Sequence, residues 1–450
     1  MTAIASELET DVRAWGERLA AQLPKPGLAP SHLVEQRMMR LLIADPRLRA
    51  ALFRFVDVRP ACLDRTDLVR HLDEYLADAD TSTLARRLSS ITRRRGARRP
   101  TASLAAVGVA VIARRFIAGD DTGTACAGLG GLWRGGMCCT VDLLGEATLT
   151  ESEGRDYEAR CVDALNVLAR ESAAWPERAL LEADDLGALC RVNLSVKVSA
   201  MTPQLRANAP ERAVAGARER LRGLLRTARD LHAHLHVDME SMDTRSSITE
   251  LVLELLAEPE FAAGPSAGIV LQAYLTDSED QLALLLSWVE EHPRGEPFTV
   301  RLVKGAYWDH EVVQSAQYGW RAPVLTDRRA CDRQYERFTR RLLDAHAAGA
   351  PVRVALASHN LRSIAHGLAY SDHLGLPEAA LELQVLRGLG EDTAAAVRGS
   401  GRRARVYSPV GDLVAGMAYL VRRLLENSSN DSFLAVYASG VNLDALMEEP

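Results

Sequence analysis

The feature that most constrains the fold is an alternation of short β-branched runs and helical segments that begins after Gly135. Eight such runs occur, and each is followed by a segment with apolar residues at three- and four-residue spacing. They are residues 139–145, 191–199, 234–239, 268–275, 298–303, 352–358, 381–386 and 404–409. Repeated strand–helix units form parallel sheets with right-handed crossovers, and eight strands close a barrel. The sequence therefore predicts an α/β fold, a (βα)8 TIM-type barrel.

The residues before the barrel follow a different pattern. From Glu7 to about Ile117 apolar residues recur at helical spacing, without the β-branched runs of the later chain. This predicts an all-helical N-terminal arm over residues 1–137, a barrel over 138–436 and a short tail over 437–450. Within the barrel, the Asp277-Ser278 pair and Asp412 stand where a helix start needs capping oxygens.

The charge balance argues against a general affinity for polyanions. The 450 residues hold 54 Lys+Arg and 60 Asp+Glu, a net charge of -6. A basic run at 91–100 has no aromatic residues that could stack on bases, so we interpret it as a solvated linker and expect no nucleic-acid partner.

Targeting and redox signals point to the cytoplasm. No apolar stretch approaches the roughly 20 residues that a transmembrane helix needs, and the acidic N-terminus lacks the charge order of a secretory signal. The seven cysteines are an odd number without a CxxC pair. We expect a cytoplasmic protein with reduced and mostly buried thiols.

The strand ends carry polar residues. In a (βα)8 barrel the active site lies at the carboxyl ends of the strands, where burying polar groups without a ligand costs free energy. The polar residues at or near these ends are Asp142, Glu146, Lys197, Asp238, Glu240, Gln272, Arg301, Lys304, His359, Gln384 and Tyr407. Their number predicts a functional cavity there.

The cations among the candidate residues predict an anionic ligand. Lys197, Arg301 and Lys304 are joined by Arg422 and Arg423, on the helix expected after the last strand. Adjacent arginines suit a bidentate grip on a carboxylate or phosphate. Alternatively, Arg422 pairs with Glu426 on a solvated helix surface.

A histidine-rich strand supports a rival function. His232, His234, His236 and Asp238 alternate along one face, as do the HxH ligands of metal-dependent barrel hydrolases. The last strand offers Tyr407 where such a site needs further ligands. We therefore expect no metal ligands, although the hydrolase stays an alternative, as does a barrel without turnover that serves as a sensor.

The assembled strand ends resemble the proline dehydrogenase family, in particular the catalytic domain of the bacterial bifunctional proline-utilisation flavoenzymes. The matching segments, in order, are VDLLGEA, SVKVSA, VDME, LQAY, RLVKGAYWD, SHN, LELQVLRGLGE, VYSPVG and AYLVRRLLENSSNDSF. The resemblance implies FAD-dependent oxidation of L-proline to 1-pyrroline-5-carboxylate, the first step of proline catabolism to glutamate.

The resemblance also implies a role for each candidate residue. Those around the substrate are Lys197, Asp238, Tyr307, Tyr407, Arg422 and Arg423, with the two arginines and the lysine on the proline carboxylate. Those around the flavin are Gln272, Arg301, Lys304, His359 and Glu426. Tyr407 favours proline over 4-hydroxyproline.

The implied partners follow from the same resemblance. Reduced flavin would pass its electrons to a quinone or another acceptor, with peripheral contact at the inner face of the membrane. A 1-pyrroline-5-carboxylate dehydrogenase would lie on a separate chain or in a domain outside this sequence.

Overall fold

The computed structural model describes residues 2–23, 115–145, 148–206, 208–412 and 443–450, with isolated residues between 47 and 77. The chain forms two compact units. The first comprises Met1–Leu23, Thr122–Val410 and Met447–Pro450, and the second comprises Pro24–Asp121 and Gly411–Leu446. The expected arm over residues 1–137 is thus divided between the two units, because its first helix belongs to the unit that contains the barrel.

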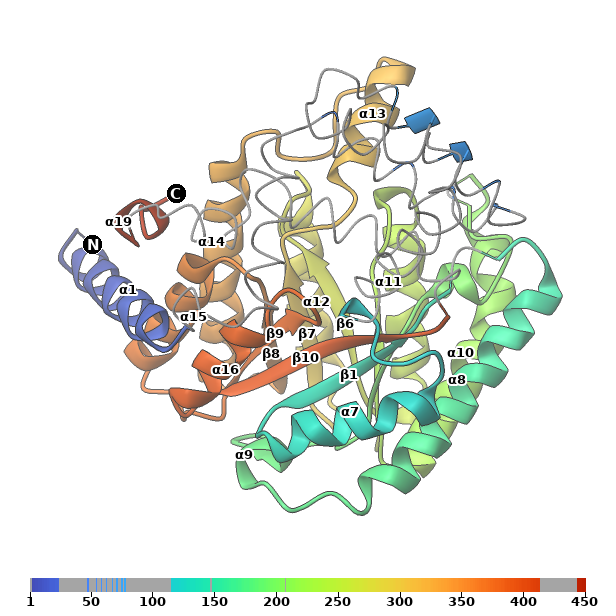
Figure 1. The fold of residues 1–450 in the computed structure, drawn as a ribbon, viewed down its shortest axis with the longest axis horizontal. Helices are drawn as coiled ribbons and strands as arrows, with labels where there is room; N and C mark the ends of the chain where they lie inside the picture. Colours follow the sequence, from blue (N-terminus) through green and yellow to red (C-terminus); the bar gives the residue numbers. More distant parts are fainter. Residues whose placement is uncertain are drawn as a thin grey trace, which may run out of the picture. The chain divides into compact units, whose positions relative to one another are not determined.

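The first unit is built around a closed barrel of parallel strands, in the order β1-β10-β9-β8-β7-β6-β5-β4 (Figure 1). Each predicted strand is present. Their bounds are β1 Cys138–Leu143, β4 Asn193–Val196, β5 His234–Val237, β6 Ser266–Gln272, β7 Phe298–Val303, β8 Val352–Ala357, β9 Leu381–Leu386 and β10 Arg403–Val410. The expected (βα)8 barrel is therefore confirmed.

Helices surround the strands and cover their outer face. Their bounds are α7 Thr122–Arg134, α8 Glu151–Ser172, α9 Ala179–Glu182, α10 Pro210–Asp230, α11 Met242–Ala257, α12 Ser278–Glu291, α13 Trp308–Tyr318, α14 Arg328–Ala347, α15 Leu361–His373 and α16 Glu391–Gly399. Short 3-10 turns occur at Val198–Ala200 and Pro259–Phe261, and a small hairpin pairs β2 (Ala183–Asp184) with β3 (Gly187–Ala188). In the second unit, α19 spans Leu443–Leu446.

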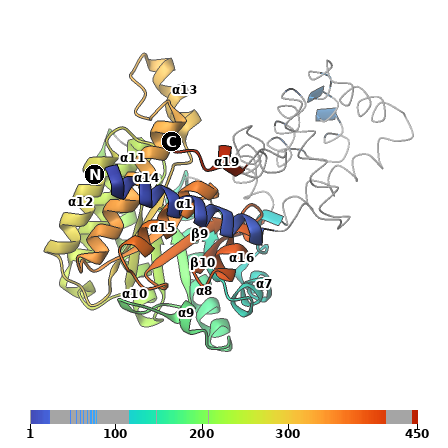
Figure 2. The same ribbon diagram turned by 90° about the vertical axis from the view of Figure 1, so that its left-hand side faces the viewer.

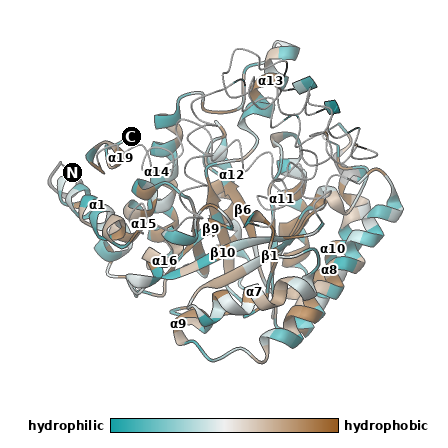
Figure 3. Ribbon diagram, viewed as in Figure 1, coloured by the Kyte–Doolittle hydropathy of each residue, from teal (hydrophilic) through white to brown (hydrophobic). Residues whose placement is uncertain are grey.

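The main apolar core lies between the strands and the helices. Outward-facing strand residues such as Leu194, Ile269 and Leu302 are fully buried. Hydrophilic residues alternate with hydrophobic ones along the outer helices α8 and α10 (Figure 3). Such amphipathic helices bury one face against the sheet and leave the other to solvent. Apolar residues spaced about 3.6 apart therefore form the layer of helices that packs on the strands.

The inside of the barrel is polar instead of apolar. Its inward-facing positions include His234, His236, Glu382, Arg403 and Arg405, all buried. Barrels of this type are usually filled by layers of Val, Ile and Leu. Here hydrogen bonds and ion pairs must replace that packing, since buried polar groups are stable only when they are paired.

The start of α12 differs from the expected cap. Asp277 does occupy the N-cap position, but its side chain accepts no hydrogen bond from the helix. Its carboxylate instead pairs with Arg245 at 2.5 and 2.6 Å. The hydroxyl of Ser278 donates to the carbonyl of Gln272 and so ties the helix to the end of β6. The helix that would follow Asp412 lies outside the described residues.

The N-terminal helix α1 (Thr2–Gln22) packs against α15 on the barrel (Figure 2). The indole N–H of Trp15 donates to Asp372 at 2.8 Å. The buried guanidinium of Arg362 joins Glu9 of α1 (2.6 Å) to Glu336 of α14 (2.9 Å). These contacts explain why the beginning of the chain groups with the barrel.

The cysteines are free, as expected. Four are buried and three are intermediate in exposure. Among the described residues, no helix is long and apolar enough to cross a membrane.

Candidate active site

An ion-pair network links five strands at their carboxyl ends. We call it the Asp238 network; its members are Asp142 of β1, Ser195 and Lys197 at the end of β4, Asp238 after β5, Arg301 of β7 and Tyr407 of β10. Asp238 is its centre, because Lys197, Arg301 and Tyr407 all donate to it. The residues come together because side chains two apart on a strand share a face, and parallel strands all end on the same side of the barrel.

The two oxygens of Asp238 are shared among three donors. Arg301 Nη1 donates to Oδ1 at 2.9 Å. Oδ2 accepts from the Tyr407 hydroxyl at 2.6 Å and from Lys197 Nζ at 3.2 Å. The Arg301 guanidinium also lies 5.4 Å from the centre of the Tyr407 ring. The carboxylate thus fixes two cations and a phenol on one side of the site.

The surroundings hold Asp238 ionised. Burial acts to raise the pKa of Asp238, but the positive charges of Lys197 and Arg301 outweigh it and lower the pKa below its usual value. For Tyr407, burial and then the negative charges of Asp142 and Asp238 raise the pKa well above 10. Tyr407 is therefore a neutral phenol that donates to a carboxylate.

Lys197 is held between two carboxylates. Its ammonium donates to Asp142 Oδ1 at 2.5 Å as well as to Asp238. Burial disfavours the charge of Lys197, yet the two carboxylates more than compensate and raise its pKa. Since an ammonium has three hydrogens, one donor remains for a ligand in the site.

Two strand-end residues, Gln272 and the network member Arg301, have polar atoms without a hydrogen-bond partner among the described residues. Gln272 Nε2 donates to the carbonyl of Glu240 at 2.9 Å, but Gln272 Oε1 has no hydrogen-bond partner among the described residues. Arg301 Nε is likewise buried without such a partner there. A buried acceptor and a buried donor without partners are unfavourable unless a bound group supplies the missing bonds.

The remaining predicted residues lie near the same ends with partners of their own. Lys304 pairs with Asp332 of α14 at 2.5 Å, and His359 Nε2 accepts from the backbone N–H of Leu386 at 2.9 Å. Tyr307 packs against an apolar cluster that includes Tyr274. Arg422, Arg423 and Glu426 lie outside the described residues, as does Glu146.

Gln384 lies two residues before the end of β9, and its amide donates to Glu382 Oε1 at 2.7 Å. It is paired in register with Arg405 of β10 and with Ala357, the last residue of β8. Its side chain thus turns to the barrel interior and takes no part in the Asp238 network that the structure shows.

The sequence interpretation missed partners of the predicted residues. Asp142 was recognised as a strand end but received no role, and Ser195, which accepts from Arg301 at 3.1 and 3.2 Å, was not singled out. Ser195 could have been found because it lies two residues before Lys197 and so shares its face of the strand. Asp332, the partner of Lys304, had no such signal in the sequence, since a helix separates the two residues.

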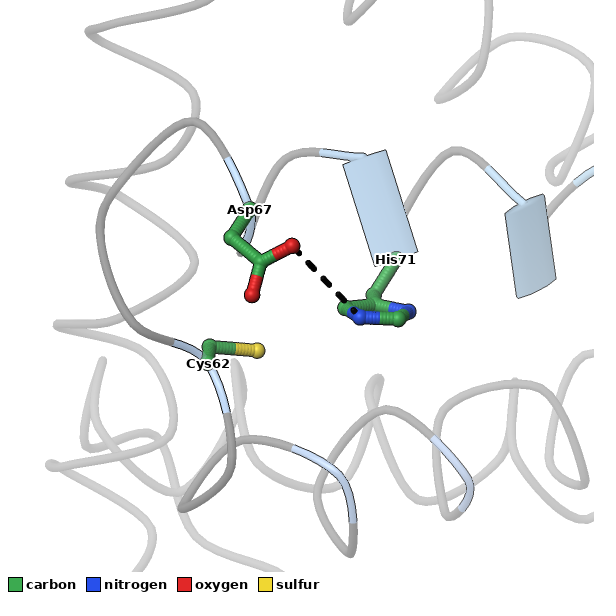
Figure 4. A group of neighbouring side chains, drawn as sticks. All are labelled: Cys62, Asp67 and His71. Carbon is green, nitrogen blue, oxygen red and sulfur yellow. Dashed lines mark ion pairs between the residues drawn. The ribbon is translucent and has the colours of Figure 1, made fainter.

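The histidine pair is not arranged as a metal site. His234 Nε2 lies 3.1 Å from His236 Nδ1, and His234 Nδ1 lies 2.9 Å from the Ser266 hydroxyl. The only group in the described part of the chain with metal-binding geometry is Cys62, Asp67 and His71 in the second unit (Figure 4). There the Arg70 guanidinium already contacts both Asp67 and His71. The rival hydrolase is not supported.

The buried histidines make stability depend on pH. Burial, followed by the nearby charges of Arg405 and Arg301, lowers the pKa of His234 to about 3. Between pH 3 and about 6.5 the unfolded chain therefore binds a proton that the folded chain does not, and stability falls as the pH falls. We expect His234 to lower the free energy of unfolding by about 1.4 kcal/mol for each pH unit by which the pH falls in this window.

Urea unfolding between pH 4.5 and 7 measures this slope. In the variant His234→Gln, the slope of the free energy of unfolding against pH should fall by the amount that corresponds to one proton. The control His310→Asn, at an exposed position on α13, should leave the slope unchanged. An unchanged slope in His234→Gln contradicts the prediction.

Comparisons with known proteins extend over both parts of the chain. The proline dehydrogenase family model matches residues 128–436, and the proline utilization A N-terminal domain model matches residues 9–116. The bifunctional protein PutA of Salmonella typhimurium is 29% identical over 348 residues, which are 76% of this chain and 25% of the relative. Proline dehydrogenase 1 of Bacillus subtilis is 24% identical over 330 residues, 73% of this chain and 91% of the relative.

A solved structure agrees with these matches. The crystal structure of proline utilization A from Bdellovibrio bacteriovorus inactivated by N-propargylglycine matches with a TM-score of 0.87 and 33% identity, over 98% of this chain and 44% of that chain. The chain thus spans about a quarter of the PutA sequences. Since the family model covers more than half of its residues, the chain belongs to the proline dehydrogenase family.

Proposed function

We propose that this chain oxidises L-proline to 1-pyrroline-5-carboxylate, with FAD as the hydride acceptor. The observation that carries the proposal is the Asp238 network at the carboxyl ends of the barrel, in a chain of the proline dehydrogenase family. It supplies cations for a carboxylate and a phenol ring beside them.

The unused polar atoms fit a flavin. A flavin ring has acceptor and donor atoms along one edge, and Arg301 Nε and Gln272 Oε1 are a buried donor and a buried acceptor. Arg301, Gln272, Lys304, His359 and Glu426 would hold the cofactor. When bound, FAD supplies a two-electron acceptor that takes a hydride from carbon, which no amino-acid side chain can do.

The chain's own part in the reaction is orientation. Arg422 and Arg423 would grip the proline carboxylate, and the third hydrogen of the Lys197 ammonium would donate to it. Tyr407 and Tyr307 would pack around the ring and exclude water. Asp238 would keep Lys197, Arg301 and Tyr407 in place, so that the C5–H bond is aligned when the substrate arrives.

The proposed partners follow from the product and from the electrons. The electrons would leave to a quinone or another acceptor, with peripheral contact at the inner face of the membrane. The 1-pyrroline-5-carboxylate would pass to a dehydrogenase outside this sequence. The relative from Salmonella typhimurium is called bifunctional, which supports a second activity in its longer chain.

An anaerobic absorption spectrum tests the function directly. Purified protein should show flavin bands that bleach on addition of L-proline. Bands that persist with proline would favour a barrel without turnover, and a colourless protein that cannot take up FAD would overturn the proposal.

The carboxylate grip is tested by kinetics. Arg422→Met or Arg423→Met should raise the KM for L-proline by about 30-fold or more, because each removes a charge-assisted bidentate contact, while flavin stays bound. Arg155→Met, at an exposed position on α8, should behave as wild type. An unchanged KM in both arginine variants refutes the assignment.

A further inference from the structure

The barrel interior below the Asp238 network holds more positive than negative charge. We call this group the lower arginine cluster; it consists of Arg353 of β8, Glu382 of β9, Arg403 and Arg405 of β10, and Asp184 of the small hairpin. All five side chains are at least nine-tenths buried. Three guanidinium groups thus meet two carboxylates.

Two of the arginines each bind both oxygens of one carboxylate. Arg405 donates to both oxygens of Glu382 at 2.7 and 2.9 Å. Arg353 donates to both oxygens of Asp184 at 2.8 and 3.3 Å. A third carboxylate, Glu296, forms an ion pair with Arg353 at 3.6 Å, but its side chain is 36% exposed, so solvent weakens its effect on the buried charges.

Arg403 is the guanidinium in excess. Its Nε lies 3.3 Å from Glu382 Oε2 and its Nη2 lies 3.7 Å from Asp184 Oδ2, and each of these carboxylates also binds another arginine. Its Nη1 atom is buried and has no hydrogen-bond or ion-pair partner in the described part of the chain. Arg403 is only 2% exposed, so solvent does not compensate its charge.

A small cavity adjoins this unused donor. Its volume is about 30 Å³, and its lining includes Arg403, Arg405, His234 and His236. His236 Nε2 is buried and also has no partner among the described residues. The two histidines add no charge, because burial lowers the pKa of each. A single water needs roughly 10–15 Å³, so the cavity can hold an ion of similar size.

We propose that this cavity binds one halide-sized monovalent anion, such as chloride, between Arg403 and His236. Water could accept the same hydrogen bonds but would leave one buried positive charge uncompensated. An anion would accept from Nη1 of Arg403 and balance that charge. The partly exposed Leu189 and Cys190 also line the cavity, so the ion has a short path to solvent. The site lies in the layer of His234 and His236, below Asp238, and is separate from the proposed proline site.

Thermal unfolding in chloride and in gluconate tests the proposal on the full chain. At constant ionic strength, replacing gluconate by chloride should raise the Tm saturably, by about 2–5 °C, since only the folded state holds the ion. Arg403→Gln should abolish the shift, and Arg155→Gln, which removes an exposed arginine from α8, should retain it. An equal Tm in both salts at every concentration overturns the proposal, as does a full shift in Arg403→Gln.

Crystals grown in bromide give an independent measurement that does not depend on a variant. We expect an anomalous peak in the cavity within about 3.5 Å of Arg403 Nη1. A site filled only by water overturns the proposal, and so does a bromide peak in a protein whose Tm does not respond to chloride.

Discussion

Replacing Asp238 by Asn is expected to lower the kcat/KM for L-proline by about 100-fold or more. A 100-fold loss corresponds to about 2.7 kcal/mol of transition-state stabilisation. The reason is that Asp238 compensates both Lys197 and Arg301 and accepts from Tyr407. Asn keeps the shape but removes the charge, so the two cations repel each other and lose their fixed positions.

Two controls separate this effect from unfolding or loss of cofactor. Tyr407→Phe removes one hydrogen bond to Asp238 and should cost less than Asp238→Asn. Asp163→Asn, at an exposed position on α8, should have wild-type kinetics. The measurement is the anaerobic rate of flavin bleaching by proline, with the flavin content and Tm of each variant. Wild-type bleaching by Asp238→Asn contradicts the role assigned to Asp238.

The second large effect is expected on stability. Glu382→Gln should lower the free energy of unfolding by about 3–5 kcal/mol, because it leaves the buried guanidiniums of Arg405 and Arg403 with too little negative charge. Burial acts to raise the pKa of Glu382, but Arg405 outweighs it and lowers the pKa to about 2. The carboxylate is therefore charged at all ordinary pH values.

Denaturant unfolding at neutral pH measures this loss. Glu279→Gln is the matched control, since Glu279 pairs with Arg337 (2.9 Å) and Arg341 at the surface and should contribute less than about 1 kcal/mol. Replacing both partners by apolar residues, Glu382→Leu with Arg405→Met, should recover part of the loss. A Glu382→Gln protein as stable as Glu279→Gln would show that the cluster does not hold the barrel together.

The sequence alone determined the number and order of the strands and most residues at their carboxyl ends. Each strand is a short β-branched run set apart from the next helix, and this signal is local. Lys197, Asp238, Arg301 and Tyr407 could be named for the same reason, because strand ends of a (βα)8 barrel converge on one side whatever the details of packing.

The tertiary structure alone decided which side chains meet. Asp142 and Lys197 are 55 residues apart, and Trp15 and Asp372 are 357 residues apart, so neither pair has a local signal. The partners of Gln384 and Arg403 depend on how the arginines of β8 and β10 share the carboxylates around them. Donors that lie far apart in the sequence can each bind the same few carboxylates. Which of them do so is determined by the closed barrel, because it brings only some of them within hydrogen-bond distance.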